Sequence, residues 1–197
     1  MSTLSIKLSS GGTVAIEMFS AVAPRHVARI CDLARGGGYD GVAFHRVIEG
    51  FMAQTGDVKF GNVKNNFDPT KVGTGGSSLI NLPPEWMIKH GEGIEFGKGR
   101  EHLIMQHPQQ GYFITLKHLK GSVSMARSEP FDSANSQFFI CLEDTPSLNN
   151  KYTIFGQVTE GMEHVEGIKK GVDAGGSVSD PDYMVKVIVN EENHENK

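Results

Sequence analysis

Short β-type runs, most of them bounded by glycine, asparagine, proline or aspartate, recur along this chain, and in some of them apolar and polar residues alternate. The clearest two cover residues 4–8 and 14–18, with Gly11 and Gly12 between them. Alternation with a period of two is typical of a strand with one buried face, and a glycine pair between two such runs predicts a hairpin. The other β-type runs are residues 43–48, 51–54, 121–126, 137–142, 152–158 and 183–189. The chain is therefore predicted to be mainly β.

Two segments instead have the spacing of an amphipathic helix. Residues 24–35 repeat apolar side chains every three or four positions, begin with Pro24 and are followed by three glycines. Proline suits the first turn of a helix and glycine its end. Met162, Val165 and Ile168 indicate a second helix ahead of two lysines and a glycine. Many short strands with two helices favour a closed or nearly closed β-barrel with helices at its ends over a doubly wound parallel sheet.

Length and composition indicate one globular domain. The chain has 197 residues, of which 38% are hydrophobic and 21% charged, which suits a domain with a sizeable core. Residues 1–189 are predicted to form this domain. Residues 190–197 are all polar or charged. Because they have no apolar area to bury against their ordering entropy, we expect them to form a frayed tail.

Charge and cysteine content argue against several classes of protein. A formal net charge of −4 and a pI near 6.1 lack the basic balance that general nucleic-acid or anionic-membrane binding needs. No apolar run is long enough to span a membrane, and no signal-peptide pattern is present. Cys31 and Cys141 lie far apart, so neither a disulfide framework nor a cysteine zinc site is predicted. We therefore expect a cytoplasmic protein without nucleic-acid or membrane partners.

The sequence also lacks the familiar hydrolase, phosphate and metal motifs. The glycine-rich residues 93–99 do not have the spacing of a phosphate loop, and no Gly-x-Ser-x-Gly or His-Glu-x-x-His motif occurs. Four histidines share one stretch, but their irregular spacing fixes no metal geometry and favours surface histidines in a polar loop. These are His90, His102, His107 and His118. No metal or cofactor is expected.

Two segments combine polar and apolar residues in a way that plain core strands do not. Residues 44–57 contain an arginine, a Phe-Met pair and a glutamine, and residues 121–140 join a strand, an Asn/Ser loop and a Phe pair. At these residues the chain closely resembles the cyclophilins, the family of cyclosporin-binding peptidyl-prolyl cis-trans isomerases, and in particular their bacterial branch. The resemblance also covers residues 22–39, the glycine turn at 73–76, and residues 152–168. It implies a closed eight-stranded antiparallel barrel capped by two helices, a groove on its outer face, and isomerase activity without a cofactor.

The resemblance also assigns roles to individual residues. Arg46 matches the catalytic arginine and Gln54 the polar groove residue. Three further positions match groove residues that hold the substrate backbone, and Tyr152 stands where animal members often carry histidine. The positions that match the proline pocket are Phe51, Met52, Phe139 and Leu148, and those that match the backbone-holding residues are Ala126, Arg127 and Gln137.

The chemistry of proline isomerisation suits these residue types. The barrier of about 20 kcal/mol arises from amide resonance, so a catalyst needs only to stabilise the twisted amide. A fixed guanidinium such as that of Arg46 can donate a hydrogen bond to the twisted amide nitrogen, while aromatic and thioether side chains hold the proline ring. Considered singly, the same residues are more typical of core packing and of a surface ion pair, but within the two segments their combination favours the functional interpretation. Two other functions stay open: a non-catalytic module that binds proline-containing peptides, and a structural scaffold.

The chain departs from the family pattern at three places. Ser147 occupies the position of the tryptophan associated with tight cyclosporin binding in many animal members, so weak cyclosporin binding is expected. Arg127 stands where animal members usually have asparagine, which predicts altered substrate preference. Residues 87–117 form an insertion whose apolar residues, including Phe96 and Tyr112, predict an added hairpin that folds onto the barrel as a rim over the groove. The expected partners are proline-containing peptides and unfolded chains, bound by a monomer.

Overall fold

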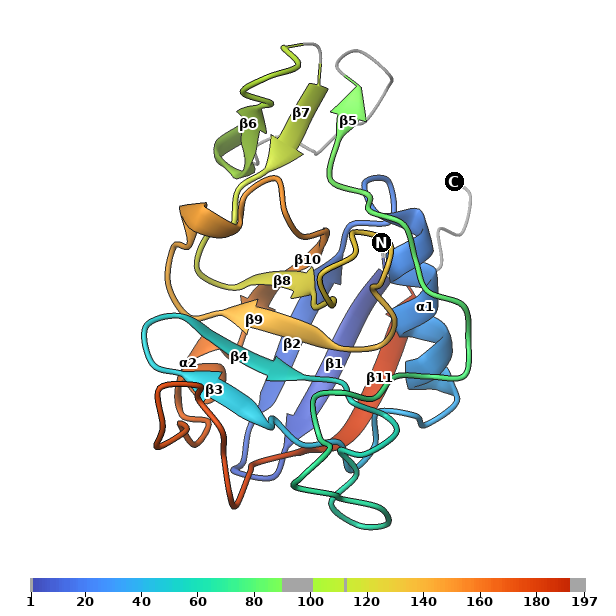
Figure 1. Ribbon diagram of the computed structural model, residues 1–197, viewed down its shortest axis with the longest axis vertical. Coiled ribbons are helices and arrows are strands. Elements are labelled where there is room, and N and C mark those ends of the chain that lie inside the picture. The colour runs from blue at the N-terminus through green and yellow to red at the C-terminus, as the bar shows by residue number, and fades with distance from the viewer. Residues whose placement is uncertain (1, 90–100, 112, 192–197) are drawn as a thin grey trace, which may run out of the picture.

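A computed structural model describes residues 2–89, 101–111 and 113–191, and its main feature is one curled eight-stranded antiparallel sheet (Figure 1). The strand order is β11-β1-β2-β10-β8-β9-β4-β3. In that order the strands span Met184–Glu191, Ser2–Leu8, Thr13–Met18, Ile154–Glu160, Ser122–Met125, Phe138–Cys141, Met52–Thr55 and Arg46–Ile48. The mainly β prediction is confirmed, and the β1–β2 hairpin pairs Leu4 with Ile16 around the Gly11–Gly12 turn.

Helix α1 spans Pro24–Arg35, as the sequence predicts, and it lies against the sheet. Its buried Val27, Ile30 and Ala34 join the apolar side chains of β1 and β2 in the main core. Ala23 gives no side-chain cap to the helix. The carboxylate of Glu85, from a distant segment, accepts the backbone N–H groups of Arg25 and His26 at 3.1 Å each, which satisfies free donors at the positive end of the helix dipole.

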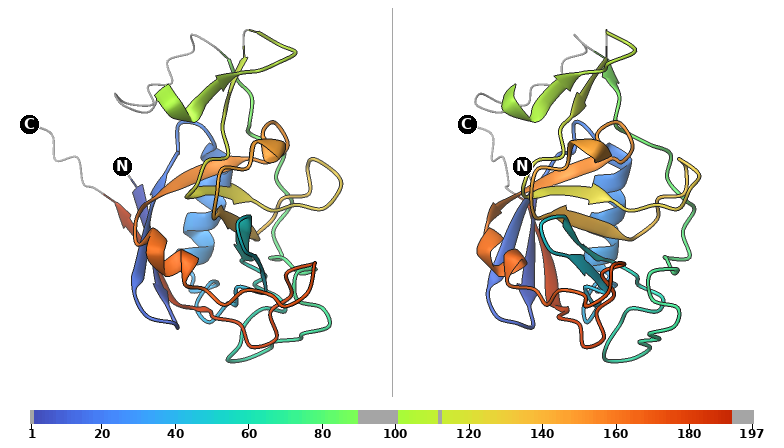
Figure 2. Two further views of the ribbon diagram at one scale, coloured as in Figure 1. Left: turned by 90° about the vertical axis from the view of Figure 1, so that its left-hand side faces the viewer. Right: turned by 60° about the vertical axis from the view of Figure 1, so that its left-hand side comes forward.

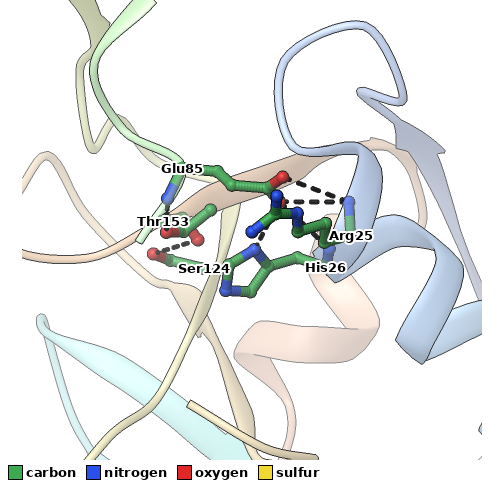
Figure 3. Close-up of polar contacts among 5 residues, drawn as sticks. All are labelled: Arg25, His26, Glu85, Ser124 and Thr153. Carbon is green, nitrogen blue, oxygen red and sulfur yellow. Dashed lines mark hydrogen bonds and ion pairs between the residues drawn. The ribbon is translucent and has the colours of Figure 1, made fainter. Parts of the chain in front are cut away.

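Figure 3 shows how Glu85 ties α1 to the sheet. Besides the two N–H groups of the helix, its carboxylate contacts Nδ1 of the fully buried His26 at 2.6 Å. Its own backbone N–H donates to Oγ1 of Thr153 at 2.9 Å, next to β10. A third contact in the same figure joins Ser124 of β8 to the carbonyl oxygen of Thr153 at 3.0 Å. Glu85 is therefore a cross-link between the helix and the middle of the sheet.

The sheet curls but does not close, so the predicted closed barrel is wrong in this respect. Strands β3 and β11 are its two edges, and the segment before β3 meets the start of β11 through the isolated bridge Ala43–Tyr183 and a few backbone hydrogen bonds, such as that from the N–H of Met184 to Val42 O at 2.9 Å. The reason lies in residues 171–178, which occupy the outer edge of the short β3. The N–H of Val47 donates to Gly176 O at 2.8 Å, and the N–H of Gly171 donates to Val47 O at 2.9 Å. A loop thus satisfies the backbone groups that a closing strand would need.

Some predicted boundaries also differ. Only Arg46–Ile48 of the run 43–48 is a strand, and helix α2 spans only Met162–Glu166, although Ile168 beyond it is fully buried. Strand β11 extends past the predicted domain end, because Asn190 pairs with Thr3 on β1. Backbone pairing needs no apolar side chain, so a polar sequence did not prevent the strand. The rest of the predicted tail, residues 192–197, lies outside the described residues.

The insertion forms a second, three-stranded sheet of order β5-β7-β6, which stands at one end of the molecule (Figure 2). Its strands span Ile88–Lys89, Phe113–Leu116 and Ile104–Gln106. Ile88, Leu103 and Leu116 share a small core with residues of the main body, namely Phe19, Val22 and Ile154. The insertion therefore folds onto the main sheet, as predicted, but with a third strand; Phe96 and Tyr112 lie outside the described residues. No helix in the described part of the chain is long and apolar enough to cross a membrane.

Candidate active site

Alternation along β4 and β9 divides their side chains between two apolar clusters. On β9, Phe138 and Ile140 enter the main core, whereas Phe139 and Cys141 face the other side of the sheet together with Met52 of β4. This is the expected result of a period of two along each strand. The outer cluster is completed by the partly buried Ile48, Phe51, Ala126, Leu148 and Tyr152.

A hollow of about 110 Å³ opens over this outer cluster. It brings together nine of the ten predicted site residues, which are Arg46, Phe51, Met52, Gln54, Ala126, Arg127, Phe139, Leu148 and Tyr152. The tenth, Gln137, lines a larger neighbouring hollow of about 510 Å³, to which Gln54, Ala126 and Arg127 also contribute. The first hollow is walled by aromatic, thioether and aliphatic side chains together with Arg46, Gln54 and Arg127, and the second mainly by glycine backbone, serine and asparagine. The groove thus has an apolar part and a polar part.

The guanidinium of Arg46 is held at the edge of the apolar hollow. Arg46 on β3 lies directly opposite Gln54 on β4, and its Nη1 donates to Gln54 Oε1 at 3.2 Å. Its Nε donates to the carbonyl oxygen of Gly175 at 2.8 Å. Because a guanidinium carries five N–H donors, these two contacts fix its plane and still leave donors that point away from them.

A chain of side-chain hydrogen bonds continues behind Arg46. Gln54 Nε2 donates to Gln137 Oε1 at 3.0 Å, and Gln137 Nε2 donates to the carbonyl oxygens of Gly73 and Gly75 at 2.9 and 2.8 Å. The backbone N–H groups of the same two glycines donate to Asp57, at 2.7 and 2.9 Å. Asp57 is fully buried. A buried carboxylate therefore anchors the glycine turn that orients Gln137, Gln54 and finally Arg46.

The side chain of Arg127 forms a wall between the two hollows. Its guanidinium carbon lies 4.5 Å from the ring centre of Phe131 and 4.8 Å from that of Tyr152, and its Nη2 donates to Lys151 O at 2.8 Å. The ring of Trp86 meets Phe131 edge to face at 5.4 Å. Such stacking of a guanidinium on aromatic faces is favourable and fixes its position. Trp86 and Phe131 were not predicted as site residues, because no motif connects two positions so far apart in the sequence.

Two buried histidines lie next to the groove. His45 precedes Arg46 and is 7% exposed, while His118 is 1% exposed behind Phe139. Burial lowers the pKa of each imidazole to about 4, so both rings are neutral at pH 7. The prediction that the clustered histidines lie on the surface is therefore wrong for His118 and holds for the exposed His102, whereas His107 is partly buried and His90 falls outside the described residues. The described residues contain no group of three metal-binding side chains.

Comparison with known proteins decides the family. Residues 3–189 match the cyclophilin type peptidyl-prolyl cis-trans isomerases. The chain belongs to the cyclophilin family. A probable peptidyl-prolyl cis-trans isomerase of Brucella suis is 45% identical over 188 residues, which are 95% of this chain and 82% of that protein. The mouse peptidylprolyl isomerase domain and WD repeat-containing protein 1 is 36% identical over 161 residues, which are 81% of this chain and 19% of that protein.

Solved structures agree with this family. The cyclophilin AquaCyp293 from Hirschia baltica superimposes with a TM-score of 0.72 at 25% identity, over 94% of this chain and 73% of the other. A cyclophilin type isomerase of Cryptosporidium parvum, crystallised in the presence of the dipeptide Ala-Pro, gives a TM-score of 0.68 at 23% identity, over 96% and 99% of the two chains. This cyclophilin is thus a peptidyl-prolyl cis-trans isomerase by family, with the family's fold.

Replacing Gly176 with alanine is expected to loosen Arg46. Gly176 has φ +80°, and an added Cβ would overlap Ile48 and press on the backbone of Val47. We expect a stability loss of about 1–3 kcal/mol and a several-fold lower kcat/KM, because the displaced loop carries the Gly175 carbonyl that holds Arg46. Gly11→Ala is the matched control, since Gly11 has φ +100° but open space around its Cβ position. Equal kinetic losses in both variants would contradict a role of this loop in holding Arg46.

Proposed function

We propose that this cyclophilin accelerates rotation about X-Pro peptide bonds in flexible and unfolded chains by a hydrogen bond from Arg46 to the twisted amide. The observation that carries the proposal is the guanidinium of Arg46, fixed by Gly175 and Gln54 at the rim of an apolar hollow. Twisting an amide ends its resonance and gives the nitrogen a lone pair, so a donor there acts mainly in the transition state. No proton transfer and no cofactor are needed for this step.

The apolar hollow supplies the other half of the mechanism. Phe51, Met52, Phe139 and Leu148 offer aromatic, thioether and aliphatic surfaces that suit a proline ring. With the ring held there and Arg46 near the nitrogen, the rest of the peptide is free to rotate. That a relative was crystallised in the presence of Ala-Pro makes an Ala-Pro peptide the natural first substrate. The cytoplasmic location and the monomeric state stay predictions.

Exchange spectroscopy of a short Ala-Pro peptide tests the proposed function. In the presence of the wild-type cyclophilin, the cis and trans signals of the peptide are expected to exchange on the timescale of the experiment, far faster than the uncatalysed tens of seconds. Line broadening by binding without faster exchange would instead support the module that binds proline-containing peptides. A spectrum that shows neither line broadening nor faster exchange would support the structural scaffold.

Weak cyclosporin binding is a further expected result. Ser147 is exposed at the end of the groove, in the 3-10 turn Pro146–Leu148, where it offers neither a large aromatic face nor an indole donor. Ser147→Trp is expected to tighten cyclosporin binding by about tenfold or more, because a contact of this kind contributes about 2 kcal/mol when buried by a ligand. Isothermal titration measures both affinities. Tight binding by the wild-type protein would contradict the prediction.

A further inference from the structure

His118 lies where the insertion rejoins the main sheet, directly behind the apolar hollow. It follows strand β7 of the insertion by two residues and precedes β8 of the main sheet. Its ring is nearly parallel to that of Phe139, with 6.1 Å between centroids and 13° between planes, and it meets the ring of Tyr152 edge to face at 6.5 Å. Phe139 and Tyr152 both line the hollow. His118 is thus the next aromatic layer beneath two of its walls.

The polar atoms of His118 also hold the loop that carries a third wall residue. Asn149 directly follows Leu148, and its Oδ1 accepts the backbone N–H of His118 at 2.7 Å and contacts His118 Nδ1 at 3.2 Å. The carbonyl oxygen of His118 accepts the N–H of Thr145 at 2.8 Å. Both ends of the segment 145–149 are therefore attached to this one residue.

These contacts determine which nitrogen of the His118 ring carries the proton. Because Asn149 Oδ1 already accepts a backbone N–H, the neutral imidazole must carry its proton on Nδ1, which donates to the same oxygen. Nε2 is then an acceptor, 3.1 Å from Oγ of Ser124 on β8. The hydroxyl proton of Ser124 has two acceptors, His118 Nε2 and the carbonyl oxygen of Thr153 (Figure 3 shows the second contact). The ring is thus fixed at Nδ1, while Nε2 competes with Thr153 O for the single hydroxyl proton of Ser124.

We infer that His118 is a positioning residue of the proline pocket, which holds Phe139, Tyr152 and the Leu148 loop in place from behind. This rests on the proposed use of the apolar hollow for proline. Close-packed side chains transmit a change in one layer to the next, so loss of this layer shifts the pocket walls without touching Arg46. Because the proline ring is held in the ground state and the transition state alike, the effect falls on binding and not on kcat.

The insertion takes part in the same arrangement. Asn149 Nδ2 lies 3.5 Å from Sδ of Met105 on β6, and the N–H of Lys117 donates to Leu103 O at 2.8 Å. The insertion therefore contacts Asn149 directly and holds His118 through the neighbouring Lys117. This gives the insertion a role as a support of the pocket loop, while the predicted rim over the groove stays a prediction, because residues 90–100 and 112 lie outside the described residues.

Two variants test the inference by different routes. His118→Phe keeps an aromatic ring of similar size but loses both ring hydrogen bonds, and Asn149→Ala keeps His118 but frees the loop. Each is expected to raise the KM and the Kd of an Ala-Pro peptide about five- to tenfold, with kcat within about twofold of the wild type. In the double variant the two effects should be clearly less than additive, because both remove the same attachment. His118→Gln, whose amide can still reach Ser124, serves if the phenylalanine variant does not fold.

His26→Phe is the matched control. His26 is also a fully buried histidine with a ring hydrogen bond, but its partner is Glu85 and it lines neither of the two hollows. It should lower the melting temperature and leave KM and Kd unchanged. Folded His118 and Asn149 variants with wild-type KM and Kd, or with fully additive effects, would overturn the inference. If the wild-type protein binds the peptide without accelerating exchange, only the proposed isomerase function is refuted. The peptide Kd, measured by NMR titration, still tests the inference in that case.

Discussion

Arg46→Ala is expected to lower kcat/KM for isomerisation of an Ala-Pro peptide by about 100- to 1,000-fold, the usual cost of removing one preorganised donor to a transition state. The side chain is fixed before substrate arrives, by Gly175 and by Gln54. The donor therefore costs little reorganisation when the amide twists. The peptide Kd should change far less than kcat, because the apolar walls around the proline ring remain.

Two further variants sharpen this prediction. Arg46→Lys keeps the charge but loses the planar guanidinium. An ammonium group cannot hold both Gly175 and Gln54 and also donate to the substrate in the same way, so this variant should keep only a small part of the activity. Arg35→Ala is the control, because Arg35 is a half-exposed arginine at the end of α1 that pairs with Asp32 and Glu191. It should have wild-type kinetics. Exchange NMR measures all three variants, and an Arg46→Ala protein within about threefold of wild type would refute the hydrogen-bond mechanism.

How far the sequence could predict the structure depended on the range of the interactions. Alternation and glycine pairs are local, and they predicted the β1–β2 hairpin and the bounds of α1. The site residues came from a family resemblance, and the structure brings nine of them around one hollow. The open edge of β3 could not be predicted, because it depends on backbone contacts between Val47 and Gly176, far along the chain. A loop that replaces a closing strand leaves no periodic pattern.

The burial of His118 was missed for a related reason. In the sequence it lies in a glycine-bearing stretch with a lysine on one side and a second lysine two residues further on, Lys117 and Lys120, which favoured a surface loop. Its environment is made by Asn149, Phe139 and Tyr152, which arrive from later strands and turns. One signal was available: His118 directly follows the predicted insertion 87–117 and stands three residues before the start of the strand run 121–126. Such a junction is a place where two packing layers meet. The hydrogen-bond partners of a polar residue there can come from any part of the chain.

Acid should destabilise this protein well above the pH at which carboxylates titrate, because of its two buried neutral imidazoles. Burial lowers the pKa of His45 to about 4, with the charge of Asp57 opposing and that of Arg46 adding to the effect. Burial likewise lowers the pKa of His118 to about 4, opposed by the Asn149 hydrogen bond. In the unfolded chain a histidine has a pKa near 6.5. Between pH 6.5 and 4 the unfolded state therefore binds more protons, and stability falls as the pH falls.

The expected loss is large enough to measure by urea unfolding. Each of the two histidines should remove about 2 kcal/mol between pH 7 and pH 5 and about 3 kcal/mol by pH 4, against a typical total stability of about 5–15 kcal/mol. The stability is fully present above pH 6.5. His118→Gln should be less stable than the wild type at pH 7, but its further loss on going to pH 5 should be about 2 kcal/mol smaller, because of these two buried imidazoles only that of His45 remains. Stability that is unchanged between pH 7 and 5, or NMR titration midpoints of both rings above pH 6, would show that these imidazoles accept protons in the folded state and are not held neutral by the groove.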